Sequence, residues 1–74
     1  SDNEEKKQEI AKLYRRFFER APEFLKEDGV MLLLTHDRAL VKKYAAEAFV
    51  CIKEFELSMK EGSYLFLMQK RRKA

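Results

Sequence analysis

The single histidine of the chain lies where a strand is expected to meet a helix, and its neighbours are polar. His36 stands between Thr35 and Asp37, directly after an apolar run. In open α/β sheets the residues just past the carboxyl end of a strand line the ligand crevice, so these three are candidates for a cleft rim. The alternative is that Thr35 or Asp37 caps the following helix and that the imidazole is solvated. No serine or cysteine motif surrounds His36, so no catalytic nucleophile is predicted.

The single cysteine, Cys51, excludes an intrachain disulfide. Without a Cys/His pair at ligand spacing, the sequence predicts no metal site. Cys51 lies in an apolar run, which favours a small buried hydrophobe in a reducing, cytoplasmic compartment. The longest apolar run, Val30 to Leu34, is far shorter than the roughly 20 residues that span a bilayer, so no membrane partner is expected. The acidic start of the chain is unlike a signal peptide.

The charge balance permits a nucleic-acid partner without requiring one. Sixteen Lys and Arg oppose thirteen Asp and Glu, for a net charge of +3. The basic terminus could neutralise RNA phosphates through Lys70, Arg71, Arg72 and Lys73. The alternative is a solubilising tail. Tyr64 and Phe66 could stack on bases, but their place in an apolar strand predicts core residues instead.

These residues must be positioned by a small set of elements, the first of which is a helix. Its apolar residues recur at three- and four-residue steps. They are Ile10, Leu13, Tyr14, Phe17, Phe18, Ala21, Phe24 and Leu25. Pro22 predicts a kink or a restart near Ala21. Gly29 is expected to close this region in the left-handed conformation.

The rest of the chain alternates between strand and helix patterns. Val30–Leu34 has no alternating polar residue, which predicts an interior strand with both faces covered. A helix with Leu40, Val41, Tyr44, Ala45 and Ala48 inward follows. Phe49–Met59 predicts a strand with one wet face and a bulge near Lys53-Glu54. A turn at Lys60-Glu61-Gly62 leads to a last strand that is apolar on both faces.

The burial pattern predicts the order of the strands. The second strand is the least apolar, so it should not lie in the middle. We therefore expect the last strand between the other two and antiparallel to both, with the first two parallel through a helical crossover. The fold class is α/β, of order helix–strand–helix–strand–strand, with a three-stranded mixed sheet in one unit over residues 1–74.

This arrangement resembles the C-terminal end of class I S-adenosylmethionine-dependent methyltransferases, which have a Rossmann-like fold. The resemblance rests on Leu13–Phe18, on Phe24–Leu33 and on the Thr35-His36-Asp37 junction. Within that family, the sequence most resembles RNA methyltransferases that carry a THUMP domain and modify transfer or ribosomal RNA. It implies S-adenosylmethionine and RNA as ligands of a parent enzyme. The chain lacks a Gly-rich loop and an Asn/Asp-Pro-Pro-aromatic element, so we expect no catalytic or cofactor-binding residue and no activity from this fragment alone.

Two other function classes remain open. One is a small basic RNA-binding module, and the other is a structural or designed α/β domain, which the regular patterning suits. Whatever the function, a fragment of a larger sheet would leave the outer edge of Val30–Leu34 bare. Bare apolar edges tend to pair with another chain, so the sequence predicts a homodimer through this strand.

Overall fold

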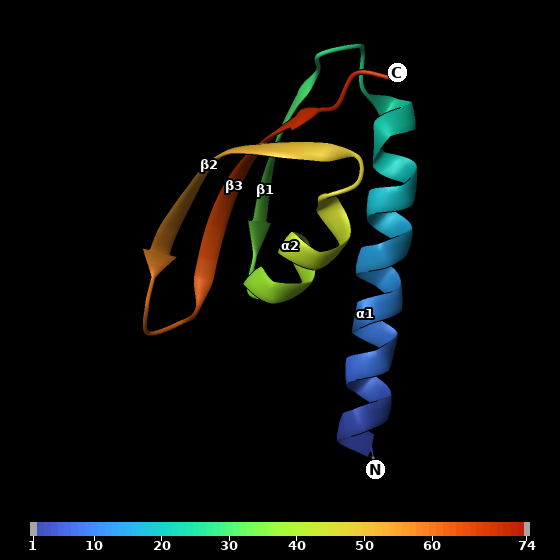
Figure 1. The fold of residues 1–74 in the computed structure, drawn as a ribbon. Coiled ribbons are helices and arrows are strands. Elements are labelled where there is room, and N and C mark those ends of the chain that lie inside the picture. The colour runs from blue at the N-terminus through green and yellow to red at the C-terminus, as the bar shows by residue number, and fades with distance from the viewer. Residues whose placement is uncertain (1, 74) are drawn as a thin grey trace.

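The computed structural model describes residues 2–73 and contains two helices, a short 3-10 helix and three strands. The elements are α1 (Asp2–Arg20), η1 (Ala21–Phe24), β1 (Val30–Thr35), α2 (Arg38–Ala45), β2 (Phe49–Ser58) and β3 (Ser63–Lys70). Figure 1 shows α1 standing along one side of the molecule, with α2 beside it. The predicted order of helices and strands is confirmed.

The sheet has the order β1-β3-β2, so the last strand lies in the centre, as predicted. Both neighbouring pairs are antiparallel, and β1 and β2 therefore run in the same direction on either side of β3. Leu65 of β3 is opposite both Leu34 of β1 and Phe55 of β2, which places these three side chains on one face. This register defines which residues meet across the sheet.

Helix α1 has an apolar stripe, but the sheet covers only its C-terminal part. Phe18 is buried and Tyr14 packs against the core, whereas Leu13 is 63% exposed. Acidic residues in the first turn complement the helix dipole. The N-terminal turns project past the rest of the molecule (Figure 1). None of the described helices is long and apolar enough to cross a membrane.

The chain leaves α1 through a 3-10 turn that contains Pro22, in agreement with the predicted restart near Ala21. The left-handed residue after this turn is Asp28, with φ 62°, and not Gly29 as predicted. Glycine is required at position 29 because there is no room for a side chain: a Cβ there would lie 2.8 Å from the carbonyl oxygen of Lys26. The Gly29 amide donates to that same oxygen, so the tight approach closes the turn.

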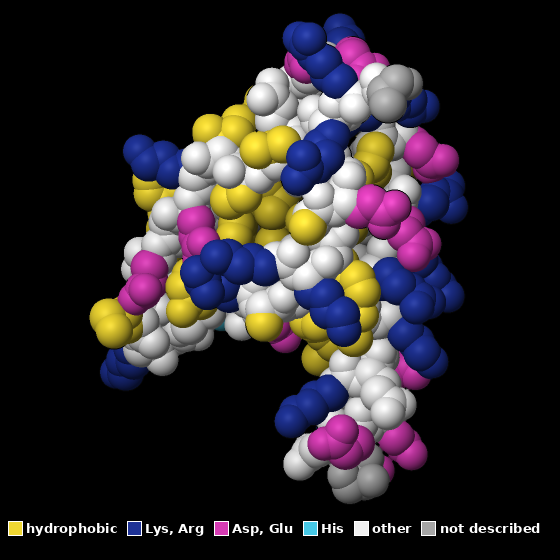
Figure 2. All heavy atoms as spheres, viewed as in Figure 1, with side chains coloured by type: hydrophobic (Ala, Val, Ile, Leu, Met, Phe, Trp, Pro, Cys, Tyr) yellow, Lys and Arg dark blue, Asp and Glu magenta, His cyan; other side chains and the backbone are white. Residues whose placement is uncertain are grey.

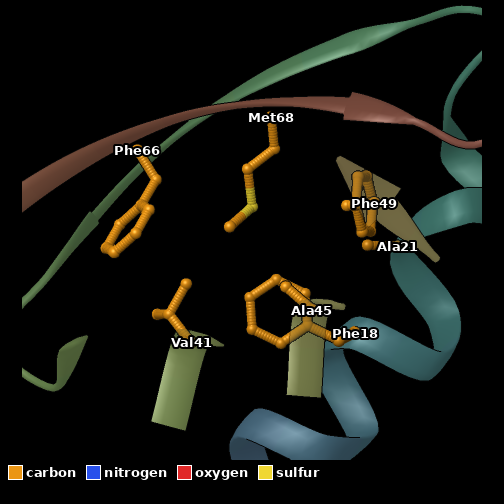
Figure 3. Packing of buried hydrophobic residues seen from close by; sticks show 7 residues of the cluster. All are labelled: Phe18, Ala21, Val41, Ala45, Phe49, Phe66 and Met68. Atoms are coloured by element: carbon orange, nitrogen blue, oxygen red, sulfur yellow. The ribbon is translucent and has the colours of Figure 1, made fainter. Parts of the chain in front are cut away.

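The core lies between the helices and one face of the sheet. In Figure 3, Phe66 and Met68 point from β3 towards Val41 and Ala45 of α2. From α1 and η1 come Phe18 and Ala21, and from β2 comes Phe49. The rings of Phe18 and Phe49 meet edge to face with centroids 6.1 Å apart. Because both helices contribute to this one cluster, the molecule has two layers.

The opposite face of the sheet is uncovered, and the prediction that β1 is covered on both faces is wrong. Its outward side chains are Val30, Leu32 and Leu34 of β1, Leu65, Leu67 and Gln69 of β3, and Val50, Lys53 and Phe55 of β2. Leu57, the extra residue of a second register shift between Glu56 and Ser58, is exposed beside them. We call this surface the open face. Leu32 and Leu34 are 64% and 61% exposed, because no described helix packs on that side.

The side of strand β2 that is exposed to solvent also differs from the predicted one. A register shift between Cys51 and Lys53 leaves Ile52 as an extra residue, which confirms the predicted bulge. Beyond this bulge Phe55 points to the open face and Glu54 points to the helix side. Cys51 is exposed at this edge strand and not buried. The alternation was therefore recognised, but its apolar side is the one that meets solvent.

Candidate functional site

The Thr35-His36-Asp37 junction is a helix start held by hydrogen bonds within the chain. The Asp37 side chain caps α2, since its Oδ1 accepts from the Leu40 amide at 3.1 Å. Thr35 is buried, and its Oγ1 accepts from the Asp37 amide at 2.8 Å. The same oxygen lies 2.7 Å from the hydroxyl oxygen of Tyr14 on α1. Thr35 thus joins the first helix, the end of β1 and the start of α2.

His36 lies on the exposed side of this junction. Its Nδ1 is 3.3 Å from the carbonyl oxygen of Glu61 in the turn between β2 and β3. A carbonyl only accepts, so this contact is a hydrogen bond when Nδ1 carries the proton. The contact connects the carboxyl end of β1 to the β2–β3 turn, at the sheet end where a ligand crevice is expected.

The chemistry available at this junction is limited, because its polar atoms serve the fold. Asp37 and Thr35 are occupied by the amides that they cap. His36 faces a carbonyl and not a hydroxyl or thiol, so no nucleophile and base are paired. The structure therefore brings the three predicted rim residues together and gives two of them a capping role.

A hollow of about 640 Å³ lies elsewhere, between α1, α2 and the C-terminal segment. Six Lys and Arg side chains and two Glu side chains contribute to its lining. The basic ones are Arg15, Lys43, Lys70, Arg71, Arg72 and Lys73, and we call this place the basic hollow. Tyr44 adds an aromatic ring beside Lys43, whose Nζ is 5.2 Å from the ring centroid. An excess of four positive charges around one concavity favours a polyanion.

The four predicted basic residues differ in whether hydrogen bonds within the chain hold their side chains. Lys70 donates its ammonium to the carbonyl oxygen of Leu25 at 2.9 Å. Arg71 donates its Nε to the carbonyl oxygen of Ala46 just after α2, at 2.9 Å. These bonds fix the direction of the segment, and the other guanidinium donors of Arg71 remain for a ligand. Lys73 is exposed at the end of the described chain.

Arg72 is engaged in a two-pronged ion pair with Asp28. Its Nε and Nη2 lie 2.8 Å and 2.9 Å from the two carboxylate oxygens. The hydrogen bonds that Arg72 donates to Asp28 lower the pKa of Asp28 below its usual value and raise the pKa of Arg72. The pair closes the turn before β1 against the end of β3, so part of the basic segment is neutralised within the chain.

A second charged cluster joins α2 to the sheet. Glu54 of β2 accepts from Arg38, and its Oε1 is 3.3 Å from the Lys42 Nζ. The Arg38 hydrogen bond is the main reason that the pKa of Glu54 is lowered. Arg38 also lies 5.9 Å from the ring centroid of Tyr64. This cluster has one carboxylate only, and residues 2–73 contain no group of acidic, His or Cys side chains fit to hold a metal ion.

Comparison with known proteins does not add a family to this geometry. No family model, curated protein or solved structure matches the chain significantly. The site must therefore be judged from its residues.

The sequence indicates the basic terminus but not that residues of both helices join it. Arg15 and Lys43 are more than 25 positions apart in the chain. Arg15 belongs to a basic helix face with Arg16 and Arg20, which Glu19 interrupts, and Lys43 has the pattern of an ordinary solvated residue of a helix. They come together because α1 and α2 pack on the same side of the sheet. No local pattern carries that information, since it depends on which face each helix covers.

Proposed function

We propose that the chain is the C-terminal, sheet-completing part of a class I S-adenosylmethionine-dependent methyltransferase domain that acts on RNA. The observation that carries the proposal is the strand order β1-β3-β2, with a reversed last strand between two strands of common direction. In the methyltransferase family that the sequence resembles, the sheet ends in this way. The proposal places the parent enzyme in the cytoplasm, and a free thiol at Cys51 suits a reducing compartment.

The outer edge of β1 supports membership of a wider sheet. Within residues 2–73, β1 pairs with β3 alone. Beside this edge lies an apolar hollow of about 200 Å³, lined by Leu13, Tyr14, Phe17, Phe18 and Leu33. Leu13 and Phe17 of α1 are exposed there although they belong to the helix's apolar stripe. A further strand paired with β1 would lie beneath these side chains and bury them.

The chain's own residues do not fit the cofactor, so no step is assigned to it here. The only glycines are Gly29 and Gly62. Gly29 closes a turn against Lys26, and Gly62 takes φ 66° in the β2–β3 turn. Neither belongs to a strand–loop–helix unit that could cradle a cofactor. On this proposal the cofactor and the target base bind to the preceding part of the domain.

The decisive test is the coding sequence immediately before Ser1. The proposal expects a Gly-rich loop after a first strand and an Asn/Asp-Pro-Pro-aromatic element. Protein expressed from that full reading frame should transfer labelled methyl groups from S-adenosylmethionine to RNA, whereas the 74-residue chain should not bind the cofactor in calorimetry. A complete reading frame that lacks both elements would refute the proposal.

A second candidate function, a nucleic-acid contact, is favoured by the basic hollow. Arg15 and Lys43 from the helices and Arg71 and Lys73 from the terminus surround one concavity. Phosphate contacts need positive charge in reach and no particular base sequence. This candidate predicts that the 74-residue chain binds single-stranded RNA by itself.

Fluorescence anisotropy with a labelled RNA, repeated at several salt concentrations, tests this candidate. The logarithm of the affinity should fall with that of the salt concentration, with a slope of about −0.7 for each phosphate contacted. Lys43→Glu should weaken binding and reduce the slope. Lys60→Glu is the matched control, because Lys60 lies in the β2–β3 turn, outside the lining of the hollow. Equal losses for both variants would contradict a contact at the hollow.

A further inference from the structure

The open face of the sheet exposes several large apolar side chains on neighbouring strands. Val30, Leu32 and Leu34 are 55–64% exposed, and Phe55 and Leu57 are 41% and 54% exposed. Leu65 and Leu67 on the central strand join these two groups into one continuous apolar area. In Figure 2 charged side chains of both signs follow the outer side of α1.

We propose that the open face is the interface of a homodimer, in which two copies of this chain pack sheet on sheet. The area of the open face is the first support for a second copy of the chain as its partner. The usual stabilisation on burial corresponds to roughly 60–120 Å² of apolar area for each side chain. Together, the apolar side chains of the open face then offer an area on the order of 600 Å². Stable complexes bury about 800 Å² on each partner, and the largest patch on a typical monomer is about 300–600 Å². The open face therefore reaches the upper end of the range for a monomer, and side chains at its border would bring it closer to the area of a stable complex.

The chemistry of the face also favours a second copy over a charged partner. Within the described strands, Lys53 is its one charged residue, and its Nζ lies 5.3 Å from the ring centroid of Phe55. Lys53 belongs to the edge strand β2, so its ammonium can reach water beyond the rim. Two copies of a nearly neutral surface do not repel each other. An acidic or basic partner, in contrast, would meet no complementary charges on this face.

The geometry of the sheet suits a symmetric contact. Strand β3 is central, so a two-fold axis over it would bring Leu65 and Leu67 of one copy against the same residues of the other. Two sheets that pack in this way lie about 10 Å apart, with their side chains interdigitated. The helices and the basic hollow would stay on the outside of the dimer. This proposal goes beyond the proposed function and does not use the RNA contact.

Sedimentation equilibrium of the 74-residue chain over a wide range of concentrations tests the proposal. A reversible dimer is expected. Phe55→Lys and Leu57→Lys should each raise its dissociation constant by about tenfold or more, because each puts a charge in place of an apolar contact of the interface. Phe24→Lys is the control, because Phe24 is 81% exposed but lies in η1, away from the open face. All three positions are exposed, so circular dichroism should report an unchanged fold.

These positions also separate the open face from the bare edge of β1. Phe55 and Leu57 lie on β2, at the side of the sheet opposite to that edge. A dimer formed by pairing of Val30–Leu34 would therefore be unaffected by both substitutions. In a sample that mixes labelled and unlabelled chains, nuclear Overhauser effects between Leu67 methyl groups of different chains are expected. A strict monomer at all concentrations, or a dimer insensitive to both variants, would overturn the proposal.

Discussion

Arg38 at the start of α2 donates to the carboxylate of Glu54 on β2, sixteen residues later in the chain. Lys42, one helical turn further on, approaches the same carboxylate. Glu54 is only 22% exposed and points towards the helices. One acidic residue on the core side of an edge strand therefore holds α2 over the sheet through two cations.

This relationship makes stability depend on pH in a defined direction. The pKa of Glu54 is lowered from its ordinary value of 4.5 by the Arg38 hydrogen bond, so the folded state favours the ionised carboxylate. Its contribution is then fully present above about pH 5 and is lost as the pH falls through the lowered value. Glu54→Gln should reduce the free energy of unfolding by about 1 kcal/mol or less at neutral pH, because the partners are half exposed.

The measurement is urea unfolding of both proteins from neutral pH to pH 3. The difference between them should shrink as the pH falls, whereas the Asp28–Arg72 pair affects both equally. Glu56→Gln is the control, since Glu56 lies on the same side of β2 and, within residues 2–73, no hydrogen bond joins it to α2, so it acts on Arg38 through its charge alone. A difference that stays constant with pH would contradict an ionic role for Glu54.

Two phenylalanines, one buried and one exposed, should differ strongly in their contribution to stability. Phe66 is fully buried between β3 and α2, and Phe24 is 81% exposed. Phe66→Ala should cost about 3–5 kcal/mol, which approaches the whole stability of a domain this small. Phe24→Ala should change stability by no more than about 0.5 kcal/mol. Circular dichroism during urea unfolding compares them, and Phe66→Leu provides a milder variant if the alanine form does not fold.

The two glycines should respond differently to the same substitutions. Gly29→Ala places a Cβ against the Lys26 carbonyl oxygen and should destabilise by about 1–3 kcal/mol. Gly62→Ala meets no atom within 4 Å, so its cost of about 1–2 kcal/mol comes from the left-handed backbone alone. Gly62→Asn should recover much of that loss, whereas Gly29→Asn should not. Thermal unfolding of the four variants distinguishes crowding from backbone conformation.

The thiol of Cys51 should be reactive in the folded protein. Its side chain is exposed on β2, on the helix side of the sheet and away from the open face. A thiol reagent should therefore modify one equivalent in native buffer about as fast as in denaturant, in a monomer or in the proposed dimer alike. Modification that requires unfolding would instead support the burial that the apolar surroundings predicted.

The sequence was sufficient for the element order and the strand order because both depend on local patterns. Period, turn residues and the weaker apolar character of Phe49–Met59 placed the last strand in the centre. Asp37 as a helix cap and Gly62 with positive φ also followed from residue type. These features are decided within a few residues, which is the range over which a sequence pattern is informative.

The errors share a different cause. An unbroken apolar strand such as Val30–Leu34 predicts two covered faces, because in a complete α/β protein an apolar face is a buried one. Here α1 and α2 both pack on the other side, so hydrophobicity alone did not report burial. The basic hollow was missed in part for the same reason. Which side of a sheet each helix covers is a property of the whole chain.

The extra residue at Ile52 has a consequence for how this surface could arise or disappear. Before the bulge, Phe49 and Cys51 share the helix side, and after it Lys53 and Phe55 share the opposite side. If the same strand alternated regularly from Cys51, without the register shift, Phe55 would turn inward and Glu54 and Glu56 would turn outward. The register shift thus decides whether this part of the surface is apolar or acidic, with no change in the sequence.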